Sequence, residues 1–592
     1  MSDYRYPYQD GVFVLNELVG LEQICHSAGL EEFAEGLAEA VLDEASKLGT
    51  EQLAPLNVVG DQQGAKLVDN QVQETPGFSD AYQQFCQGGW PSLAANPEFG
   101  GQGLPNALSV AVNEVWQSSN LAWALCPLLT QGAIEALETH GSEQLQQHYL
   151  PKLISGEWTG TMNLTEPDAG TDLAALKTRA VPEGDHYRIT GQKIFITWGD
   201  HQMTENIVHL VLARLPDAPA GVKGISLFVV PKFLLDENGQ VTDQRNDASA
   251  VALEHKLGIH GSPTCVMSFG DNGGAIGYLV GEENNGLACM FTMMNDARQG
   301  VGLQGLAISE RAYQQALEYA KDRVQGTLSD GSRVTIMKHP DVRRMLLQMK
   351  SGIQAMRALT YVARAESDLC QHAQDSEQRA KHQARTDLLT PIVKGWVTEL
   401  AQEMTYLAVQ VHGGMGFIEE TGAAQHYRDA RILTIYEGTT GIQALDLIGR
   451  KTLVDSGAAL TDLLSEIASD LDQISEPELQ DLVSATRDAL THADEAKKWV
   501  LEIASKDSAA AGAASVSFMM LLGYLCGGWL SVKSASIAQT KLNDPESDQP
   551  FLESKIVSTR FYVEQLLPRT SGLLSAVMAG GDAVMQLSEE QF

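Results

Sequence analysis

One glutamate stands where a general base could work. Glu437 follows an apolar run at residues 432–436, and Gly438 comes directly after it. The residues from Thr440 to Gln443 then fit the S/T-x-x-E/Q capping box that begins a helix. Apolar surroundings raise the pKa of a carboxyl group, while a nearby helix N-terminus lowers it. A base that works near neutral pH needs this balance, although a lone glutamate before a helix is more often a capping or surface group.

Two other segments have residue types that suit contact with a ligand. TEPDAGTD at residues 165–172 combines turn-forming residues with two hydroxyl groups, and its small residues would let a ligand approach the backbone. The same composition is also typical of an ordinary loop. GGMG at residues 413–416 could bind a ligand or simply cap the helix before it. Because no GxGxxG motif follows a predicted strand, a Rossmann nucleotide site is not indicated.

The spacing of apolar residues shows which elements must position these segments. Helical spacing at both ends of the chain surrounds a region of short β-branched runs, which is typical of an α+β fold and not of alternating α/β units. The predicted parts are an N-terminal arm (1–35), an N-terminal helical domain (36–158), a middle β-domain (159–283), a helical bundle domain that contains Glu437 (284–451) and an additional C-terminal helical domain (452–592).

Two stretches in the helical regions need a more specific prediction. The polar stretch at residues 371–387 predicts a solvated connection between two long helices. Residues 508–532 contain no charge and are long enough to span a membrane. Because this stretch contains several Ser, Gly and Ala residues and has helices on both sides, we expect a buried core helix and no integral membrane span.

The excess of acidic residues disfavours some classes of binding partner. The formal net charge of −35 argues against nucleic acid, which needs a Lys/Arg surface, and against an anionic membrane surface. The 7 cysteines are scattered without a CxxC pair, so we expect a reducing compartment and no metal site. The N-terminal residues lack the basic-then-apolar layout of a signal peptide, which favours the cytoplasm.

Four segments in combination resemble the acyl-CoA dehydrogenase family. They are residues 163–180, 191–200, 410–432 and 433–451. TEPDAGTD is similar to the first family signature, and QVHGGMGF at residues 410–417 is similar to the second. The arm and the additional C-terminal domain resemble a bacterial subclass of about the length of this chain, which includes fatty acyl-CoA dehydrogenases and 3-methylmercaptopropionyl-CoA dehydrogenases. The resemblance implies a helical N-terminal domain, a β-barrel-like middle domain and a four-helix bundle.

The resemblance also implies roles for matching residues. Glu437 matches the catalytic base, and Arg298 and Thr171 match residues near the bound acyl-CoA. Phe195 stands where many members have a tryptophan beside the flavin ring, with Trp198 three residues on. The positions that match FAD contacts are Thr165, Thr171, Phe195, Thr197, Arg323, Gln410, Gly413, Gly414 and Thr439. Among them, Arg323, Gln410, Gly413 and Gly414 match residues that reach the FAD of a neighbouring subunit.

Some positions depart from the family pattern. Asn163 replaces a small residue, Gln425 replaces Lys or Arg, Gly441 replaces a frequent glutamine, and Asn295 replaces a frequent aspartate. These departures concern contacts to the cofactor and to coenzyme A. They leave the assignment of the base unchanged.

The family chemistry implies a reaction and partners. Glu437 would take the α-proton of an acyl-CoA while the β-hydride passes to flavin N5, which gives a trans-2-enoyl-CoA. The substrate would be a medium- or long-chain fatty acyl-CoA or 3-methylmercaptopropionyl-CoA. An electron-transfer flavoprotein would accept the electrons, and shared FAD contacts predict a homodimer or larger assembly. Met293 and Met294 are candidates for the acyl pocket, although methionines at helical spacing are more often core.

Three rival functions stay open at this point. An acyl-CoA oxidase would keep the same base and flavin but let oxygen reoxidise the flavin. A flavoprotein of the same fold that binds DNA is disfavoured by the acidic balance. A non-catalytic helical assembly protein is disfavoured by the sequence around Glu437.

Overall fold

The computed structural model describes residues 4–30 and 36–592. The chain divides into two compact units. The helical unit contains Met1–Ser46, Pro105–Ser118 and Val301–Phe592, and the sheet unit contains Lys47–Leu104 and Ser119–Gly300. Of the predicted N-terminal arm, residues 1–3 and 31–35 lie outside the described residues. The long helix α9 (Gly286–Asp322) begins in the sheet unit and continues in the helical unit.

The sheet unit is built around an eight-stranded sheet. The strand order is β10-β11-β5-β12-β7-β6-β3, with β4 paired to β5. Only β3 and β6 pair in parallel; the other pairs of this sheet are antiparallel. The strands are β3 (Trp158–Asn163), β4 (Arg179–Glu183), β5 (His186–Thr197), β6 (Asn206–Ala213), β7 (Ser226–Pro231), β10 (Ala248–Leu253), β11 (Thr264–Phe269) and β12 (Ala275–Val280). The β character predicted for this region is confirmed.

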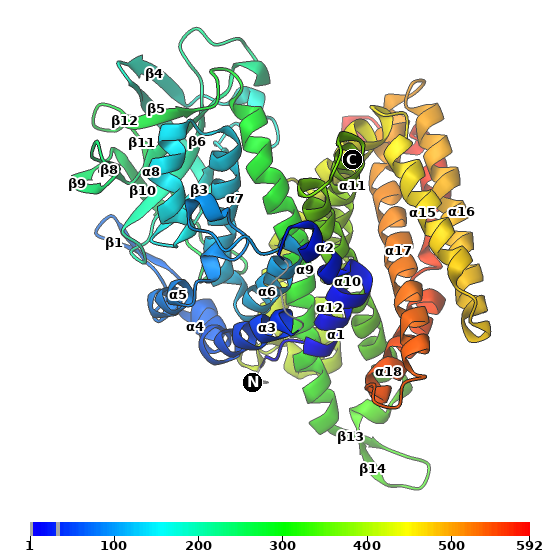
Figure 1. The fold of residues 1–592 in the computed structure, drawn as a ribbon. Coiled ribbons are helices and arrows are strands. Elements are labelled where there is room, and N and C mark those ends of the chain that lie inside the picture. The colour runs from blue at the N-terminus through cyan, green and yellow to red at the C-terminus, as the bar shows by residue number, and fades with distance from the viewer. Residues whose placement is uncertain (1–3, 31–35) are drawn as a thin grey trace. The chain divides into compact units, whose positions relative to one another are not determined.

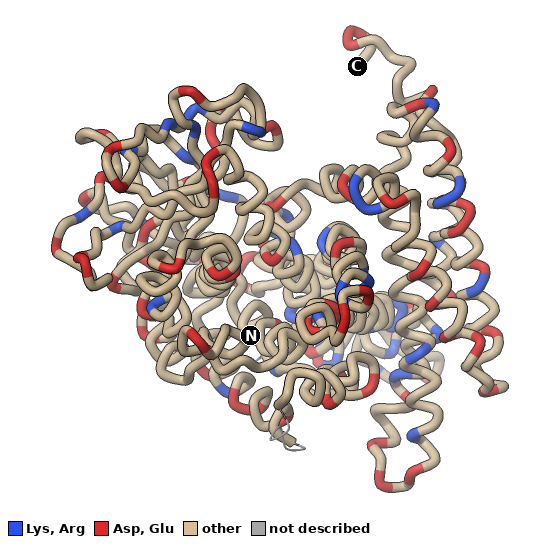
Figure 2. The backbone as a smooth tube through the Cα atoms, turned by 45° about the horizontal axis from the view of Figure 1, so that its top comes forward, with Lys and Arg blue, Asp and Glu red and all other residues tan. Residues whose placement is uncertain are grey.

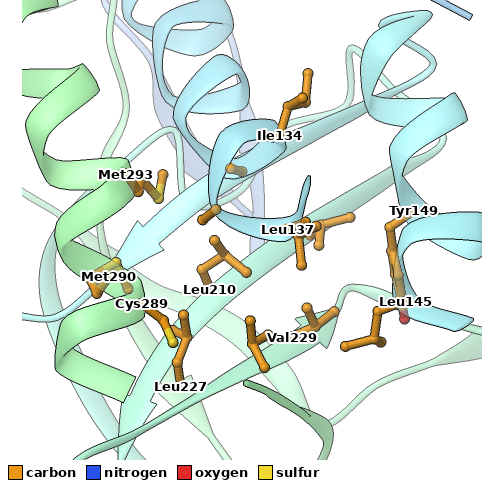
Figure 3. Packing of buried hydrophobic residues seen from close by; sticks show 14 of the residues in the cluster. Ile134, Leu137, Leu145, Tyr149, Leu210, Leu227, Val229, Cys289, Met290 and Met293 are labelled. Carbon is orange, nitrogen blue, oxygen red and sulfur yellow. The ribbon is translucent and has the colours of Figure 1, made fainter. Parts of the chain in front are cut away.

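Apolar side chains from helices and strands form one core of the sheet unit. Helices α7 (Leu121–His140) and α8 (Glu143–Ile154) contribute buried residues that pack with those of the strands. Figure 3 shows Met290 and Met293 of α9 in the same cluster as Leu210 and Leu227. Met293 is completely buried there, so it belongs to the core, and Met294 packs against it.

A small hairpin interrupts the region that the sequence predicts as helical. Strands β1 (Lys66–Val68) and β2 (Gln71–Gln73) pair between helices α4 (Ala54–Gln63) and α5 (Phe78–Gln87). The two turn residues, Asp69 and Asn70, both have positive φ (49° and 59°), as a two-residue hairpin turn requires. Strands of three residues are too short to show a period in the sequence, so the sequence did not indicate this hairpin within the helical domain.

Long helices form the bundle of the helical unit, as predicted. They are α10 (Pro340–Gln371), α11 (Ser376–Ile392), the π-helical turn η8 (Val393–Val397) and α12 (Thr398–His412). The prediction of a solvated connection over residues 371–387 was wrong for most of that stretch. Asp375 caps α11 by accepting a hydrogen bond from the backbone N of Gln378 (2.8 Å), so the polar residues form an exposed helix face.

The additional C-terminal region is a set of helices around one apolar helix. They are α15 (Ala458–Gln473), α16 (Gln480–Ile503), α17 (Ser508–Lys541), α18 (Gln549–Gln565) and α19 (Arg569–Met578). Figure 1 shows α15, α16 and α17 running side by side, and α17 also packs against α18, α19, α10 and α14 (Thr440–Ile448). Among the described helices, only α17 is apolar and long enough to cross a membrane, and 67% of its most apolar window is buried. This burial favours the predicted core helix.

A buried cluster of charges ties together five segments of the helical unit. Acidic residues outnumber basic ones by 76 to 41 and occur along the whole backbone (Figure 2). Against this background, the guanidinium of Arg357 on α10 is completely buried and contacts the carboxylates of Asp10, Glu114 and Glu310. Lys555 on α18 pairs with Asp10 at 2.7 Å. The N-terminal arm is thereby anchored to both the bundle and the additional C-terminal helices.

The pKa values of two of these carboxyl groups move in opposite directions. Burial raises the pKa of Glu114 above its ordinary value, in spite of the nearby Arg357. Burial also raises the pKa of Asp10, but Lys555 and Arg357 outweigh it, so the pKa of Asp10 lies below its ordinary value. Arg357 therefore favours the charged form of both carboxyl groups, and at Asp10, where Lys555 adds to it, this effect exceeds that of burial.

We predict that Arg357→Met strongly destabilises the helical unit. The substitution leaves buried carboxylates without their main counter-ion, and breaking a buried pair in this way costs about 3–5 kcal/mol. Urea unfolding followed by circular dichroism measures the loss. Arg344→Met on the same helix is the control, because Arg344 pairs with Asp341 on the surface and its loss should cost less than about 1 kcal/mol. Equal losses for the two variants would contradict the buried cluster as an anchor.

Candidate functional site

The residues predicted to do chemistry fall in both units. The sheet unit contains Thr165, Thr171, Phe195, Thr197 and Arg298. The helical unit contains Arg323, Gln410, Gly413, Gly414, Glu437 and Thr439. Each unit therefore presents its own half of the predicted machinery.

A buried ion pair fixes the loop that carries the first signature. Lys193 of β5 is completely buried, and its Nζ donates to the carboxylate of Glu166 (2.8 Å) and to the carbonyl oxygen of Leu164 (3.0 Å). The same carboxylate accepts hydrogen bonds from the backbone N of Lys177 (2.7 Å) and of Thr178 (3.0 Å). A carboxylate with so many donors can stay charged in a buried place. The sequence analysis did not identify this pair.

The electrostatics of the pair agree with its burial. Burial lowers the pKa of the Lys193 amine to about 8, although Glu166 opposes this shift. Burial raises the pKa of Glu166, but the charge and hydrogen bond of Lys193 outweigh it and hold that pKa below its ordinary value. Both groups are therefore charged near neutral pH, and each depends on the other.

The loop and strand β5 are held in one register. The backbone N of Ile194 donates to the carbonyl oxygen of Thr165 (2.9 Å), next to the ion pair. Two backbone hydrogen bonds between Glu166 and Ala169, each 3.0 Å, close the turn that follows. The side chain of Thr165 is half-buried, while Thr171 is exposed on the far part of the loop. This arrangement presents both threonines on a fixed backbone.

Phe195 sits at a bulge in β5. The pairing with β11 shifts between Cys265 and Met267, so Ile194 and Phe195 together oppose one residue. Phe195 has φ of 60° and its side chain is 58% exposed. A bulky residue in the left-handed region is strained, and such strain clusters at functional sites, as bulges do. The bulge therefore turns an aromatic ring outward at the predicted flavin position.

The neighbouring aromatic residue has a different role. Trp198 also has a positive φ, 53°, but its side chain is buried. Its ring N–H donates to the carbonyl oxygen of Ala122 (3.1 Å), and the ring stacks on Phe78 with centroids 6.2 Å apart. Trp198 is thus a structural anchor at the end of β5, and Phe195 is the ring that a ligand could stack on.

These features fit a planar aromatic cofactor. The exposed ring of Phe195 offers a stacking surface, and the half-buried hydroxyls of Thr165 and Thr197 offer hydrogen bonds beside it. Asn163, one of the departures, is completely buried at the end of β3 and donates to the hydroxyl of Thr161 (2.8 Å). The side chain of Asn163, which is larger than the residue it replaces, is therefore packed inside the protein.

Arg298 lies inside helix α9 and is almost completely buried. Its guanidinium donates to the side-chain oxygen of Asn295 (3.3 Å) and lies over the ring of Phe291, 5.9 Å from the centroid. Asn295 is another departure, and here it serves as the hydrogen-bond acceptor that a family aspartate would provide.

Glu437 lies on a strained turn in the helical unit. It has φ of 55° and Gly438 has φ of 93°, so two successive residues are left-handed just before α14. The amide of Gln443 donates to the carbonyl oxygen of Glu437 (3.1 Å), and the amine of Lys394 donates to that of Gly438 (2.6 Å). The half-buried side chain of Glu437 therefore extends from a backbone whose carbonyl oxygens are fixed by two side-chain donors.

The helix after Glu437 begins as predicted, but its cap differs. The capping residue is Thr439, whose hydroxyl accepts a hydrogen bond from the backbone N of Ile442 (3.3 Å), and not Thr440. The predicted capping box was wrong because Gln443 points back to the turn at Glu437 and the hydroxyl of Thr440 donates to Glu399. Thr439 was predicted as a cofactor contact, and its hydroxyl oxygen already serves this cap.

The residues expected to serve a neighbouring subunit are exposed. Gly413 ends α12 with φ of 60°, which confirms the capping interpretation of GGMG. A Cβ atom added at Gly413 or Gly414 would meet no atom within 4 Å, so this backbone is open to a ligand or a partner. Gln410 and Arg323 are exposed as well, and Arg323 leads into a protruding hairpin, β13 (Val324–Thr327) and β14 (Arg333–Thr335).

The remaining departures lie near these segments. Gln425 is buried within helix α13 (Ala423–Ala430), where its amide donates to Asp429 (3.2 Å). Gly441, in the first turn of α14, leaves space into which a Cβ would contact only the hydroxyl of Thr439 at 3.9 Å. Gln425 is therefore occupied inside the fold, and Gly441 leaves open space at the first turn of α14.

Comparison with known proteins identifies the family. Four family domains match in order: "Acyl-CoA dehydrogenase, N-terminal domain" at residues 38–157, its middle domain at 161–272, its C-terminal domain at 284–453, and "Acetyl-CoA dehydrogenase C-terminal like" at 463–588. The domain limits expected from the sequence analysis stay predictions.

Individual relatives from this family are similar in sequence to the whole length of this chain. A 3-methylmercaptopropionyl-CoA dehydrogenase of Ruegeria pomeroyi is 46% identical over 99% of this chain and 100% of its own. The broad-specificity linear acyl-CoA dehydrogenase FadE5 of Mycobacterium tuberculosis is 34% identical over 100% of both chains. An acyl-CoA dehydrogenase of Bacillus anthracis, solved in complex with FAD, has the same fold with a TM-score of 0.75 at 20% identity, over 94% of this chain and 91% of that one. This chain belongs to the acyl-CoA dehydrogenase family, whose members are FAD-dependent oxidoreductases that act on a CH–CH bond.

Proposed function

We propose that this chain oxidises the Cα–Cβ bond of an acyl-CoA thioester to a trans-2-enoyl-CoA, with Glu437 as the base that removes the α-proton. The observation that carries the proposal is the turn at Glu437. Both Glu437, which has the carboxylate, and Gly438 after it have a left-handed backbone, and helix α14 begins directly after this turn. Such strain persists only where the surroundings enforce it. A carboxylate on a backbone held this firmly is suited to a single geometry of proton transfer.

Each half of the machinery has its own task in this proposal. Glu437 accepts the α-proton, and its backbone N–H stabilises the negative charge that grows on the thioester oxygen. The hydroxyls of Thr165 and Thr197 would orient the flavin ring, and the ring of Phe195 would offer it a stacking surface. FAD, when bound, supplies the hydride acceptor. Arg298 and Thr171 contribute to holding the acyl-CoA.

The substrate is proposed from the relatives. The full-length relative of Ruegeria pomeroyi acts, by its name, on 3-methylmercaptopropionyl-CoA, which makes this thioester the first candidate. The relative of Mycobacterium tuberculosis has broad specificity for linear acyl-CoA, so medium- and long-chain fatty acyl-CoA are the second. A pocket for either would be apolar with one polar end.

The partners are proposed from the exposed residues of the helical unit. Open backbone at Gly413 and Gly414, together with exposed Arg323, supports a second copy of this chain whose FAD these residues would contact. The electrons are proposed to pass to an electron-transfer flavoprotein. A location in the cytoplasm stays a prediction.

We predict that Glu437→Gln abolishes the reduction of the flavin by acyl-CoA. The amide cannot accept a proton, and a positioned base contributes about 10²- to 10⁴-fold to such a step. The purified protein is titrated anaerobically with thioesters from propionyl-CoA to palmitoyl-CoA and with 3-methylmercaptopropionyl-CoA, while its visible spectrum is recorded. The variant should stay yellow, since its FAD is retained, whereas the wild type is bleached.

The control for this experiment is Glu502→Gln, which removes an exposed carboxylate that pairs with Lys506. Its bleaching should match the wild type. If no thioester bleaches the yellow wild type, the proposed reaction is wrong. If Glu437→Gln is bleached at the wild-type rate, Glu437 is not the base.

We also predict that the ion pair of Glu166 and Lys193 stabilises the loop that contains the first signature (residues 165–172), because each side chain compensates the buried charge of the other. Glu166→Gln or Lys193→Met alone leaves one buried charge unpaired and should cost about 3–5 kcal/mol in the free energy of unfolding. The double variant removes both charges and should cost less than the sum of the two. Urea unfolding and the dissociation constant of FAD are measured for all three. Additive losses would show that the two side chains do not act as a pair.

A further inference from the structure

A buried lysine lies directly behind the turn that carries Glu437. Lys394 belongs to the π-helical turn η8, between α11 and α12, and its side chain is completely buried. Its Nζ donates to the carbonyl oxygen of Gly438 at 2.6 Å. Burial of an ammonium group costs several kcal/mol that its partners must offset, and Gly438 is one of them, so the choice of a lysine at this place needs an explanation.

The explanation lies in what the turn requires. Glu437 and Gly438 are both left-handed, and the carbonyl oxygens of both accept hydrogen bonds from buried side chains, those of Gln443 and Lys394. The bond from Lys394 is charge-assisted, which makes it shorter and stronger than a bond between neutral groups. The two donors therefore fix two successive peptide planes, of which the first adjoins the Cα atom of Glu437 and the second holds Gly438 after it.

The other side of η8 is packed against the additional C-terminal helices. A Cβ at Gly395 would lie 2.3 Å from Met519 of α17, and a Cβ at Gly523 would lie 2.1 Å from the ring of Trp396. Trp396 is completely buried, with its ring 5.8 Å from that of Tyr524. Helix α17 also packs against α14, which begins just after the base. The turn η8 thus reaches the turn at Glu437 through Lys394 and contacts α17 through Gly395 and Trp396.

The type of turn supports a special role. A π-helical turn inserts one residue into an α-helix, and such turns occur frequently at functional sites. Here it places a lysine and a tryptophan two residues apart, where one reaches the turn at Glu437 and the other contacts α17. The close contacts of Gly395 and Gly523 leave little freedom for the turn to move.

We propose that Lys394 is a positioning residue for Glu437 and that α17 of the additional C-terminal region holds the turn that carries Lys394. This inference rests on the proposed function, because it assigns Glu437 the role of base. It gives the additional helices a role in the reaction: α17 holds η8, and Lys394 of η8 fixes the backbone next to Glu437. Lys394 itself touches the backbone of the turn and acts through Glu437.

The test separates the rate of proton removal from binding. Lys394→Met has a similar volume and no donor, and Lys394→Gln keeps a neutral donor. For Lys394→Met we expect the rate of anaerobic flavin bleaching by the best thioester to fall about 10- to 100-fold, the range expected for loss of a hydrogen bond to a charged group. The dissociation constant of a non-oxidisable thioether analogue of that substrate should stay within about 3-fold of wild type, because a positioning role acts on the transition state. Lys394→Gln should recover part of the rate.

Two further variants complete the test. Lys555→Met removes another buried lysine of the helical unit, which pairs with Asp10, and should lower the urea midpoint without changing the bleaching rate. Trp396→Phe keeps a ring but loosens the contact with α17, and it should lower the bleaching rate, less than Lys394→Met does, with analogue binding retained. It also keeps the inference testable if Lys394→Met fails to fold.

The outcomes distinguish this inference from the proposed function. A wild type that no thioester bleaches overturns both. A bleached wild type with Lys394→Met at the same rate overturns only the positioning role. Equal losses of rate and analogue binding in both Lys394 variants also overturn it, since that result indicates a general structural role. An unchanged rate in Trp396→Phe overturns the part assigned to α17.

Discussion

A hydrogen bond from a buried lysine ammonium to a backbone carbonyl lies beside each half of the candidate site. Lys193 donates to Leu164 next to the loop that contains the first signature, and Lys394 donates to Gly438 next to Glu437. In both places a residue for which a chemical role is proposed, Phe195 or Glu437, has a left-handed backbone. Strain of this kind would relax without strong local bonds, and a charged donor in a place without water gives the strongest bonds that a side chain can make.

This shared design explains which parts of the site could be predicted from the sequence. Glu437 and the signature segments could be found because their residue types and order resemble a family. Lys193 and Lys394 were missed because a lysine in an apolar stretch has no periodic signal, and its burial depends on acceptors far away in the chain. Glu166 was passed over as part of a turn, although its carboxylate is the centre of a hydrogen-bond network.

The fold was predictable where patterns are long and not where they are short. The change from helical to β spacing and its return correspond to the run of strands from β3 to β12 and to the long helix α9 that follows. The hairpin β1–β2 and the cap at Thr439 depend on single φ values and single hydrogen bonds, which the pattern of apolar residues does not contain. Helix α11 was missed because its first turns face solvent, so its polar composition resembled that of a loop.

The buried cluster around Arg357 has a consequence for how the chain is made. Asp10 and Lys555, which meet there, are 545 positions apart, and the helical unit is assembled from three separate stretches of sequence. During synthesis the sheet unit is complete once residue 300 has left the ribosome, whereas Asp10 has no lysine to meet until α18 emerges. Asp10 can pair with Arg357 once α10 has been made, but the cluster is complete only when α18 has emerged. A chain that stopped before α18 would keep Arg357 but lack Lys555, so Asp10 would have one of its two cationic partners and the arm a weaker anchor.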